Sequence, residues 1–264
     1  MSQMTFVNTL KKAPVRGAFF VLLMLATLFT LSSLLNASDA TTYRVKKVID
    51  GDTLKLQNGD SVRFIGINTP ELGHGKFKDE PLANQARRFV QRKIEGREVE
   101  LRDEQVRRDK YGRRLAHIYT SAGQNVQIEL LQRGLAFVVA VSDDLSYLDE
   151  YLVAEQQARQ AEKGVWGETF YAPVGAKSAL DNRRRGYQRV FGTVQRVSRS
   201  KKYQTLHLQG DFRVLISHEN WQKNFKGQSK TYIGKSIETR GWIFKSHGVT
   251  GMKVSHPSML VAKS

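Results

Sequence analysis

A short stretch between residues 50 and 71 concentrates side chains that can bind cations and phosphates. It opens with the carboxylates of Asp50 and Asp52, has Arg63 in its middle and ends in Asn68-Thr69-Pro70-Glu71. Carboxylate and amide oxygens are the ligands that a hard cation such as Ca²⁺ takes in proteins. The planar guanidinium of an arginine matches the oxygens of a phosphate. Together these groups could stabilise charge, activate a water and hold a substrate, which is what hydrolysis of a phosphodiester requires.

A β-hairpin would bring the two ends of this stretch together. Residues 53–57 and 61–67 alternate with the two-residue period of a β-strand, and Asn58-Gly59-Asp60 between them is typical of a tight turn. Because a hairpin folds its ends back onto each other, we expect Asp52 and the segment 68–71 to be neighbours. Arg63 would then lie one strand away.

A second polar stretch, Asp109-Lys110-Tyr111-Gly112-Arg113, adds another guanidinium. With Asp52, Arg63 and the segment 68–71, it resembles the staphylococcal nuclease (thermonuclease) family, over about residues 42–167. Several short motifs at family-like spacing carry the resemblance. It implies an enzyme that hydrolyses the phosphodiester bonds of DNA and RNA with little sequence preference, leaving 5′-hydroxyl and 3′-phosphate ends.

The resemblance also implies Ca²⁺ as the cofactor. Its ligands would be the side chains of Asp52 and Asn68 and the backbone carbonyl of Thr69. Asp50 is expected either to support these ligands or to have a structural role. The family usually has aspartate at the position of Asn68. Asparagine keeps a carbonyl oxygen but removes one negative charge, so the affinity for calcium should fall or the metal preference should change. The alternative is that Asn68 only caps the turn that follows it.

The resemblance assigns the chemistry to three further side chains. Glu71 would take a proton from the attacking water, and Arg63 and Arg113 would grip the scissile phosphate. A carboxylate near a cation and two arginines is expected to have a low pKa. Lys110 and Tyr111 match positions that contact a terminal phosphate of a bound nucleotide. Alternatively, Glu71 is a surface glutamate and Arg113 an exposed loop charge.

The pattern of residues 41–167 predicts a mainly β domain with helices. Five short strands with interspersed helices fit an OB-type barrel, which is also the fold that the resemblance implies. The expected strands are 43–49, 52–57, 61–67, 97–103 and 113–119, followed by a buried strand at 135–141. The expected helices are 81–94, 125–133 and 145–162, the last capped by Ser142-Asp143-Asp144.

Residues 1–40 are expected to be an export signal or a membrane anchor. Lys11, Lys12 and Arg16 precede the uncharged, mostly apolar run 17–35, and small residues follow around 38–40. This run is longer than the usual apolar core of a signal peptide, about 7–15 residues, so it could also span a bilayer uncleaved. Either way we expect the rest of the chain to be periplasmic, secreted or membrane-anchored. The chain has no cysteine, so packing and ligands must replace disulfides.

Positive charge is concentrated towards the end of the chain. Of the net charge of +17, residues 1–40 carry +2, residues 41–182 carry +1 and residues 183–264 carry +14. A block as one-sided as the last more often marks a polyanion-binding region than a solubilising one.

The basic region is expected to form a second, OB-like barrel over residues 187–264, after a linker at 168–186. Its aromatic side chains lie among many lysines and arginines, as in a cationic groove that stacks the bases of a single strand. The alternative is that half or more of these aromatic residues form the core. The expected strands are 188–198, 203–208, 212–217, 236–244 and 250–255.

Two other functions stay open at this point. The first is a non-catalytic protein that binds nucleic acid or another polyanion through a nuclease-like domain weakened by Asn68. The second assigns the basic region to acidic glycans or lipid headgroups. The sequence contains no zinc or nucleotide-cofactor motif that would favour another chemistry.

Overall fold

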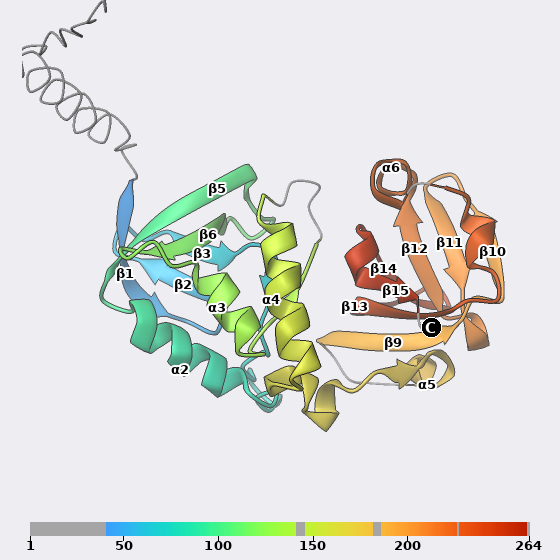
Figure 1. Ribbon diagram of the computed structural model, residues 1–264, viewed down its shortest axis with the longest axis horizontal. Helices are drawn as coiled ribbons and strands as arrows, with labels where there is room; N and C mark the ends of the chain where they lie inside the picture. Colours follow the sequence, from blue (N-terminus) through green and yellow to red (C-terminus); the bar gives the residue numbers. More distant parts are fainter. Residues whose placement is uncertain (1–40, 141–145, 182–185, 226, 263–264) are drawn as a thin grey trace, which may run out of the picture. The chain divides into compact units, whose positions relative to one another are not determined.

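The five strands predicted between residues 43 and 119 form a closed barrel in the computed structural model, which describes residues 41–140, 146–181, 186–225 and 227–262 (Figure 1). The strand order around the barrel is β1-β2-β3-β6-β5, with β3 and β6 parallel and the other pairs antiparallel. This arrangement confirms the OB-type barrel. The strands are β1 (Thr42–Val48), β2 (Thr53–Leu56), β3 (Ser61–Phe64), β5 (Glu98–Arg108) and β6 (Arg114–Thr120).

The predicted hairpin joins β2 to β3. Asn58 Oδ1 accepts a hydrogen bond of 3.0 Å from the backbone N–H of Asp60, and Gly59 has a φ of 96°, which favours glycine. The turn sets a register in which Thr53 faces Arg63. The hairpin thus fixes the distance along the strands between Asp52 and Arg63.

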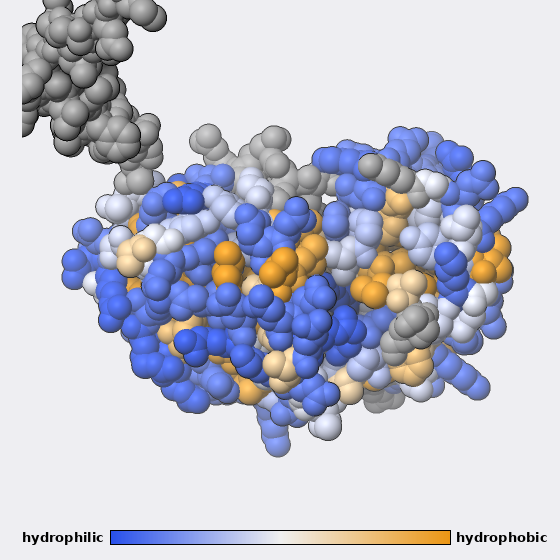
Figure 2. Space-filling model, viewed as in Figure 1, coloured by the Kyte–Doolittle hydropathy of each residue, from blue (hydrophilic) through white to orange (hydrophobic). Residues whose placement is uncertain are grey.

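Alternate residues of the barrel strands point into a closed core. Val45, Leu54, Val62 and Phe64 are buried in it, and α2 (Ala83–Ile94) adds one apolar face, including Phe89 and Val90. Burial of side chains of this size contributes about 1.5–3 kcal/mol each. Hydrophilic residues cover most of the face of the barrel region that is seen in Figure 2.

Two strand predictions in this region were wrong in extent. The predicted strand 61–67 is broken into β3 and β4 (Ile67–Asn68), and of 135–141 only β7 (Phe137–Val138) pairs, with β4. The apolar run at 135–140 is buried, but only its two residues in β7 join a ladder, and periodicity alone cannot separate a paired strand from a buried segment.

The remaining elements of the barrel region follow the prediction with shifted ends. The predicted loop 104–112 is shorter, because β5 continues to Arg108 and pairs there with Arg114. Residues 102–108 are mostly charged, so this part of β5 shows no alternation of apolar and polar residues that would have predicted a strand. The proposed helix cap at 142–144 lies outside the described residues. The two helices are α3 (Val126–Gln132) and α4 (Leu148–Gln160).

The segment 168–186, predicted to be a linker, contains short ordered elements in its described part. Tyr171 packs with Phe137 and Tyr187, and Ala176 and Ala179 are buried in the core of the basic region. Small and aromatic residues therefore anchor this segment, a role that its proline and glycine content concealed. The elements of this segment are the 3-10 helix η2 (Thr169–Tyr171), strand β8 (Val174–Gly175) and helix α5 (Ala176–Asp181), and the 3-10 helix η1 (Gly164–Trp166) precedes it.

The basic region is strand-rich, as expected, and forms one eight-stranded sheet (Figure 1). The order is β10-β11-β12-β14-β13-β9-β8, and β15 pairs with β13. The predicted strand 188–198 is divided into β9 and β10. The strands are β9 (Tyr187–Thr193), β10 (Arg196–Arg199), β11 (Tyr203–His207), β12 (Arg213–Ser217), β13 (Ser236–Ser246), β14 (Val249–Lys253) and β15 (Leu260–Ala262).

Short helical turns connect these strands. Phe212 and Phe225 are buried in the core of the region and Trp221 and Tyr232 pack against it, whereas Phe191 and Trp242 are exposed, so its aromatics divide between the two interpretations. The turns are the 3-10 helices η3 (Gln209–Asp211), η5 (Ser229–Tyr232) and η6 (Pro257–Met259), the helix α6 (His218–Asn220) and the π-helical turn η4 (Trp221–Phe225).

A buried ion pair joins α4 to the sheet of the basic region. Glu155 Oε2 lies 2.6 Å from Arg240 Nη1, and the two side chains are 7% and 6% exposed. Glu155 Oε1 also accepts a hydrogen bond of 2.7 Å from the backbone N–H of Val138. The Glu155 carboxylate therefore keeps its partners only while α4 stays packed against β7 and β13.

The Glu155→Gln variant is expected to lower the free energy of unfolding by about 3–5 kcal/mol, because it removes the carboxylate that is paired with the buried Arg240 guanidinium. Urea denaturation measures this loss. The matched variant Glu162→Gln, at an exposed position after the same helix, should change the stability by less than about 0.5 kcal/mol. Equal midpoints for the two variants would show that the ion pair does not stabilise the fold.

The predicted export or anchor segment, residues 1–40, lies outside the described residues, as does Arg183-Arg184-Arg185. Within the part of the chain that the structure describes, no helix has the length and apolar character needed to cross a membrane.

Candidate active site

The start of β2 and the loop after β4 meet through Asp52. Its Oδ2 accepts a hydrogen bond of 2.8 Å from the backbone N–H of Thr69 and lies 3.0 Å from Arg63 Nη2. The Asp52 side chain is 6% exposed and that of Arg63 is 15% exposed. The hairpin therefore brings a buried carboxylate, a guanidinium and the segment 68–71 together, as predicted.

The side-chain amide of Asn68 links Arg63 to Thr69. Its Oδ1 accepts a hydrogen bond of 3.2 Å from Arg63 Nη2, and its Nδ2 donates one of 3.0 Å to the carbonyl of Thr69. The alternative of a simple turn cap does not describe these contacts. The side-chain N–H of Asn68 thus donates to the Thr69 carbonyl, the group that was expected to bind a cation. An aspartate at this position has no N–H and could not donate this hydrogen bond.

A close backbone approach holds the Asp50–Asp52 loop in place. A Cβ atom on Gly51 would lie 2.6 Å from Thr69 Oγ1 and 2.8 Å from Ala86 Cβ, so only glycine fits between the loop and α2. Asp50 Oδ1 accepts a hydrogen bond of 3.0 Å from the backbone N–H of Asp52. Burial, together with the charge of Asp52, raises the pKa of Asp50 to about 6. Asp50 thus helps to hold the loop that carries Asp52.

Glu71 begins a loop that is closed by Glu80. The backbone N–H of Glu71 donates to Glu80 Oε2 (3.0 Å), and the backbone N–H of Glu80 donates to the carbonyl of Glu71 (2.9 Å). A cavity of about 220 Å³ opens beside Glu71 and is also lined by Phe77, Lys78 and Phe170. The loop therefore presents Glu71 at the edge of a hollow surface.

The pKa of Glu71 differs from the sequence-based expectation. Protein atoms crowd its carboxylate, and this desolvation, with the charges of Asp52 and Asp50, raises its pKa to about 7, against the opposing effect of Arg63. The low pKa was expected beside a cation and two arginines; with Arg63 alone, desolvation and the charges of Asp52 and Asp50 outweigh the positive charge. A carboxylate with a pKa near neutrality is well suited to accept a proton.

Arg113 lies in the hairpin loop between β5 and β6. Its Nε donates to Asp109 Oδ2 at 2.7 Å, and its backbone N–H donates to Asp109 Oδ1 at 3.0 Å. Its guanidinium lies 5.5 Å from the ring of Tyr111, and Lys110 Nζ lies 5.0 Å from the same ring. Tyr111 is 72% exposed. The three predicted residues of this loop thus form a separate cluster of two cations and one aromatic ring.

The barrel register relates this loop to Arg63. Arg63 is paired with Leu115 in the parallel β3–β6 ladder, and Arg113 precedes Leu115 by two residues. Arg113 itself lies in the loop immediately before β6, so the ladder places it near the strand end beside Arg63. The contacts described above join Arg63 to Asp52 and Asn68 but join Arg113 to Asp109.

The structure identifies three residues that support the site, of which the sequence had indicated only Asp50. Gly51, Asp50 and Glu80 position the loops that carry Asp52 and Glu71. The Asp-Gly-Asp triplet was a signal for the first two. Nothing in the sequence indicates Glu80, because its partner is reached through the folded loop 71–80.

The donor set fits a hard cation in its chemistry. Asp52 Oδ2 and Asn68 Oδ1 converge on one positively charged atom, Arg63 Nη2, at 3.0 and 3.2 Å. Oxygen ligands of this kind suit Ca²⁺, and Asp50 and Glu71 add negative charge nearby. Arg63 and the Asn68 amide already satisfy part of this charge. The fit is therefore that of a weaker site than one with two carboxylates.

Comparison with known proteins agrees with this geometry. The family described as staphylococcal nuclease homologue matches residues 61–168. This region of the chain belongs to the staphylococcal nuclease family. The match contains Arg63, Asn68, Glu71 and Arg113, and Asp52 lies before it, next to the first residue of β2, which pairs with β3.

Three relatives carry the same region. The chain is 33% identical over 141 residues to "Endonuclease YncB" of Bacillus subtilis (strain 168), covering 52% of this chain and 66% of that protein. It is 34% identical over 130 residues to "SPbeta prophage-derived endonuclease YokF" of the same organism, covering 47% and 44%. It is 29% identical over 141 residues to "Thermonuclease" of Staphylococcus hyicus, covering 52% and 82%. The chain spans less than two thirds of the first two of these relatives.

Proposed function

We propose that this protein is a nuclease that hydrolyses phosphodiester bonds of DNA and RNA with little sequence preference and depends on Ca²⁺. The observation that carries the proposal is the convergence of Asp52 and Asn68 oxygens on Arg63 at 3.0 and 3.2 Å. It combines oxygens that suit a hard cation with a guanidinium that suits a phosphate. The names of the three relatives, two endonucleases and one thermonuclease, support the same reaction class.

The residues of the chain supply the separate parts of the reaction. Arg63, held by Asp52 and Asn68, presents its guanidinium in a fixed direction to the scissile phosphate. Glu71, with its pKa raised to about 7, accepts the proton of the attacking water. A bound cation would be held by Asp52, Asn68 and Thr69, and would supply charge stabilisation at the phosphate. Arg113, in the loop before β6, would stabilise charge that develops during the reaction.

Digestion of single-stranded DNA tests this proposal. Activity is expected with calcium and is expected to disappear with a chelator. Glu71→Gln should lower kcat about 10²–10⁴-fold because it removes a general base. Arg113→Ala should lower it about 10²–10³-fold because one charge-stabilising donor is lost. A gel assay of a labelled oligonucleotide measures all four conditions.

Two results would contradict the proposal. Equal activity of the three proteins, with and without calcium, would refute the assigned roles. Binding without cleavage in Ca²⁺, Mg²⁺ and Mn²⁺ would select the non-catalytic alternative. The variant Glu98→Gln, at an exposed position on the barrel strand β5, is a matched control that should leave kcat unchanged.

We further propose that residues 1–40 direct the protein out of the cytoplasm. The positive residues, the apolar run 17–35 and the small residues around 38–40 support export, with cleavage or with retention as an anchor. Intact-mass measurement of the exported protein distinguishes the two forms. A cytoplasmic protein of full mass would contradict both.

A further inference from the structure

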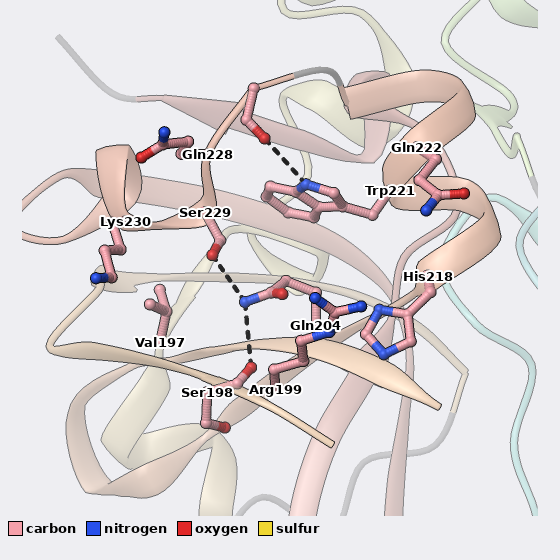
Figure 3. Close-up of a pocket in the computed structure, with 11 residues that line it drawn as sticks. Val197, Ser198, Arg199, Gln204, His218, Trp221, Gln222, Gln228, Ser229 and Lys230 are labelled. Atoms are coloured by element: carbon pink, nitrogen blue, oxygen red, sulfur yellow. Dashed lines mark hydrogen bonds between the residues drawn. The ribbon is translucent and has the colours of Figure 1, made fainter. Parts of the chain in front are cut away.

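A cavity of about 460 Å³ opens at the end of the sheet in the basic region. Its volume is within the range of small-molecule sites, about 300–1,000 Å³. Strands β10 and β11, helix α6, the π-helical turn η4 and the start of η5 surround it (Figure 3). Val197, Arg199, Gln204, His218, Trp221 and Ser229 contribute to its lining.

The indole of Trp221 is held in one orientation. Its ring stacks on Phe225 with centroids 5.3 Å apart and an interplanar angle of 7°, and Tyr232 packs edge-on at 6.0 Å. Its Nε1 donates a hydrogen bond of 3.2 Å to the carbonyl of Gly227. Phe225 covers one face of the indole, and Figure 3 shows Trp221 over the space that contains Gln204 and Arg199. A flat aromatic surface is therefore offered to the cavity, from a π-helical turn of the kind often found at functional sites.

Gln204 gives the cavity a fixed hydrogen-bond acceptor. Its Nε2 donates to the carbonyl of Ser198 at 3.2 Å and to Ser229 Oγ at 2.7 Å. Because both amide hydrogens are engaged, the carbonyl oxygen is left to accept from a ligand. The N–H groups on the edge of a nucleobase are donors of the matching kind.

The charge around the cavity suits a polyanion. Arg199 lines it, and Figure 3 shows its guanidinium beside His218 and below Trp221. Lys230 also lines the cavity, and Figure 3 shows its ammonium group on the opposite side from Arg199 and His218. These residues belong to the segment 183–264, whose net charge is +14. A stacking surface beside a guanidinium within a cationic region is the arrangement that binds single strands.

A second polar cluster lies near the same strands but does not face the cavity. Ser198 Oγ lies 2.7 Å from His207 Nε2, and His207 Nδ1 lies 2.6 Å from Asp211 Oδ1. Hydrogen bonding from Arg213 lowers the pKa of Asp211 to about 2. Figure 3 shows the Ser198 hydroxyl turned away from Trp221. Ser198 is thus a lining residue of the cavity, but its hydroxyl braces β10, β11 and η3 and does not point towards Trp221.

We propose that this cavity binds an unpaired base of single-stranded nucleic acid, stacked on Trp221, with Arg199 at a neighbouring phosphate. This inference rests on the proposed nuclease function, since it assigns the capture of a substrate strand to the basic region. Base edges meet Gln204, and the phosphates on either side meet the cationic rim. The site accepts different bases because stacking uses the flat face that all of them share.

Binding is measured in a chelator, so that cleavage does not interfere. The full chain is titrated with a labelled oligonucleotide of about 12 nucleotides, within the usual range of single-strand site sizes. Trp221→Ala should weaken binding about fivefold to a hundredfold, as expected for the loss of one base stack, and Trp221→Phe should restore part of it. Arg199→Ala should reduce the slope of log K against log salt by about 0.7. Parallel titrations with RNA and DNA oligonucleotides identify which nucleic acid is preferred.

Matched controls separate stacking from charge. Trp242 is 41% exposed on β13, and Trp242→Ala should change binding less than twofold. Lys253, exposed on β14, serves as the control for Arg199. An abasic oligonucleotide of equal length should bind at least about fivefold more weakly than the oligonucleotide with bases.

Three outcomes would overturn the proposal. These are unchanged binding by Trp221→Ala, equal binding of the abasic strand, and equal competition by an acidic polysaccharide. The near-ultraviolet circular dichroism of each variant verifies folding. Because binding is scored without cleavage, a chain that binds as described but cuts nothing would refute the nuclease and retain this site.

Discussion

Arg63→Ala is expected to lower kcat about 10³–10⁵-fold, the range found when an arginine that stabilises a transferring phosphoryl group is lost. Arg63 has no substitute in its position, because Arg113 is paired with Asp109 in a separate loop. The change also leaves Asp52 buried without its counter-charge, so we expect a lower free energy of unfolding, by about 3–5 kcal/mol without calcium. Single-turnover cleavage of an oligonucleotide and urea denaturation measure the two effects.

A conservative variant separates charge from geometry at this position. Arg63→Lys keeps the charge beside Asp52 but cannot contact Asn68 and a phosphate with the same planar fork. It should recover most of the lost stability and little of the activity. If Arg63→Ala keeps more than about a tenth of the wild-type kcat, the assignment of Arg63 to the phosphate is wrong.

Asn68→Asp is expected to make the stability of the protein more dependent on calcium: lower than that of the wild type without calcium, and more strongly raised by calcium. Without a divalent cation, the variant loses the hydrogen bond from Asn68 Nδ2 to the Thr69 carbonyl. It also places a second negative charge beside Asp52, whose own charge already raises the pKa values of Asp50 and Glu71. We expect a loss of about 1–3 kcal/mol in the free energy of unfolding. With calcium, the additional carboxylate should raise the affinity at least about tenfold.

Thermal unfolding in chelator and in a calcium series measures both directions. In chelator the Tm of Asn68→Asp should lie below that of the wild type, and its rise with calcium should begin at a lower concentration. Asn220→Asp adds the same charge on α6 in the basic region and serves as the control. If neither protein responds to calcium, the proposed ligand set is wrong. If both respond equally, Asn68 is not a ligand.

Much of the barrel could be predicted because its information is local. The turn at Asn58-Gly59-Asp60 is specified by residues that favour it, and the alternation in β2 and β3 sets which side chains are buried. These features were enough to place Asp52 beside the segment 68–71. Elements whose partners are distant were predicted less well. β7 and the short elements after residue 168 depend on contacts with β4, Tyr187 and the core of the basic region.

The site shows the same division. The sequence by itself determined which groups are present: the oxygens of Asp52, Asn68 and Glu71 and the guanidiniums of Arg63 and Arg113. Only the tertiary structure decided their state. The pKa of Glu71 rises to about 7 because burial and the charges of Asp52 and Asp50 outweigh Arg63, and the Asn68 amide spans Arg63 and Thr69. Residue types follow from the chain, but electrostatic energies depend on distances and on the exclusion of water, which exist only after folding.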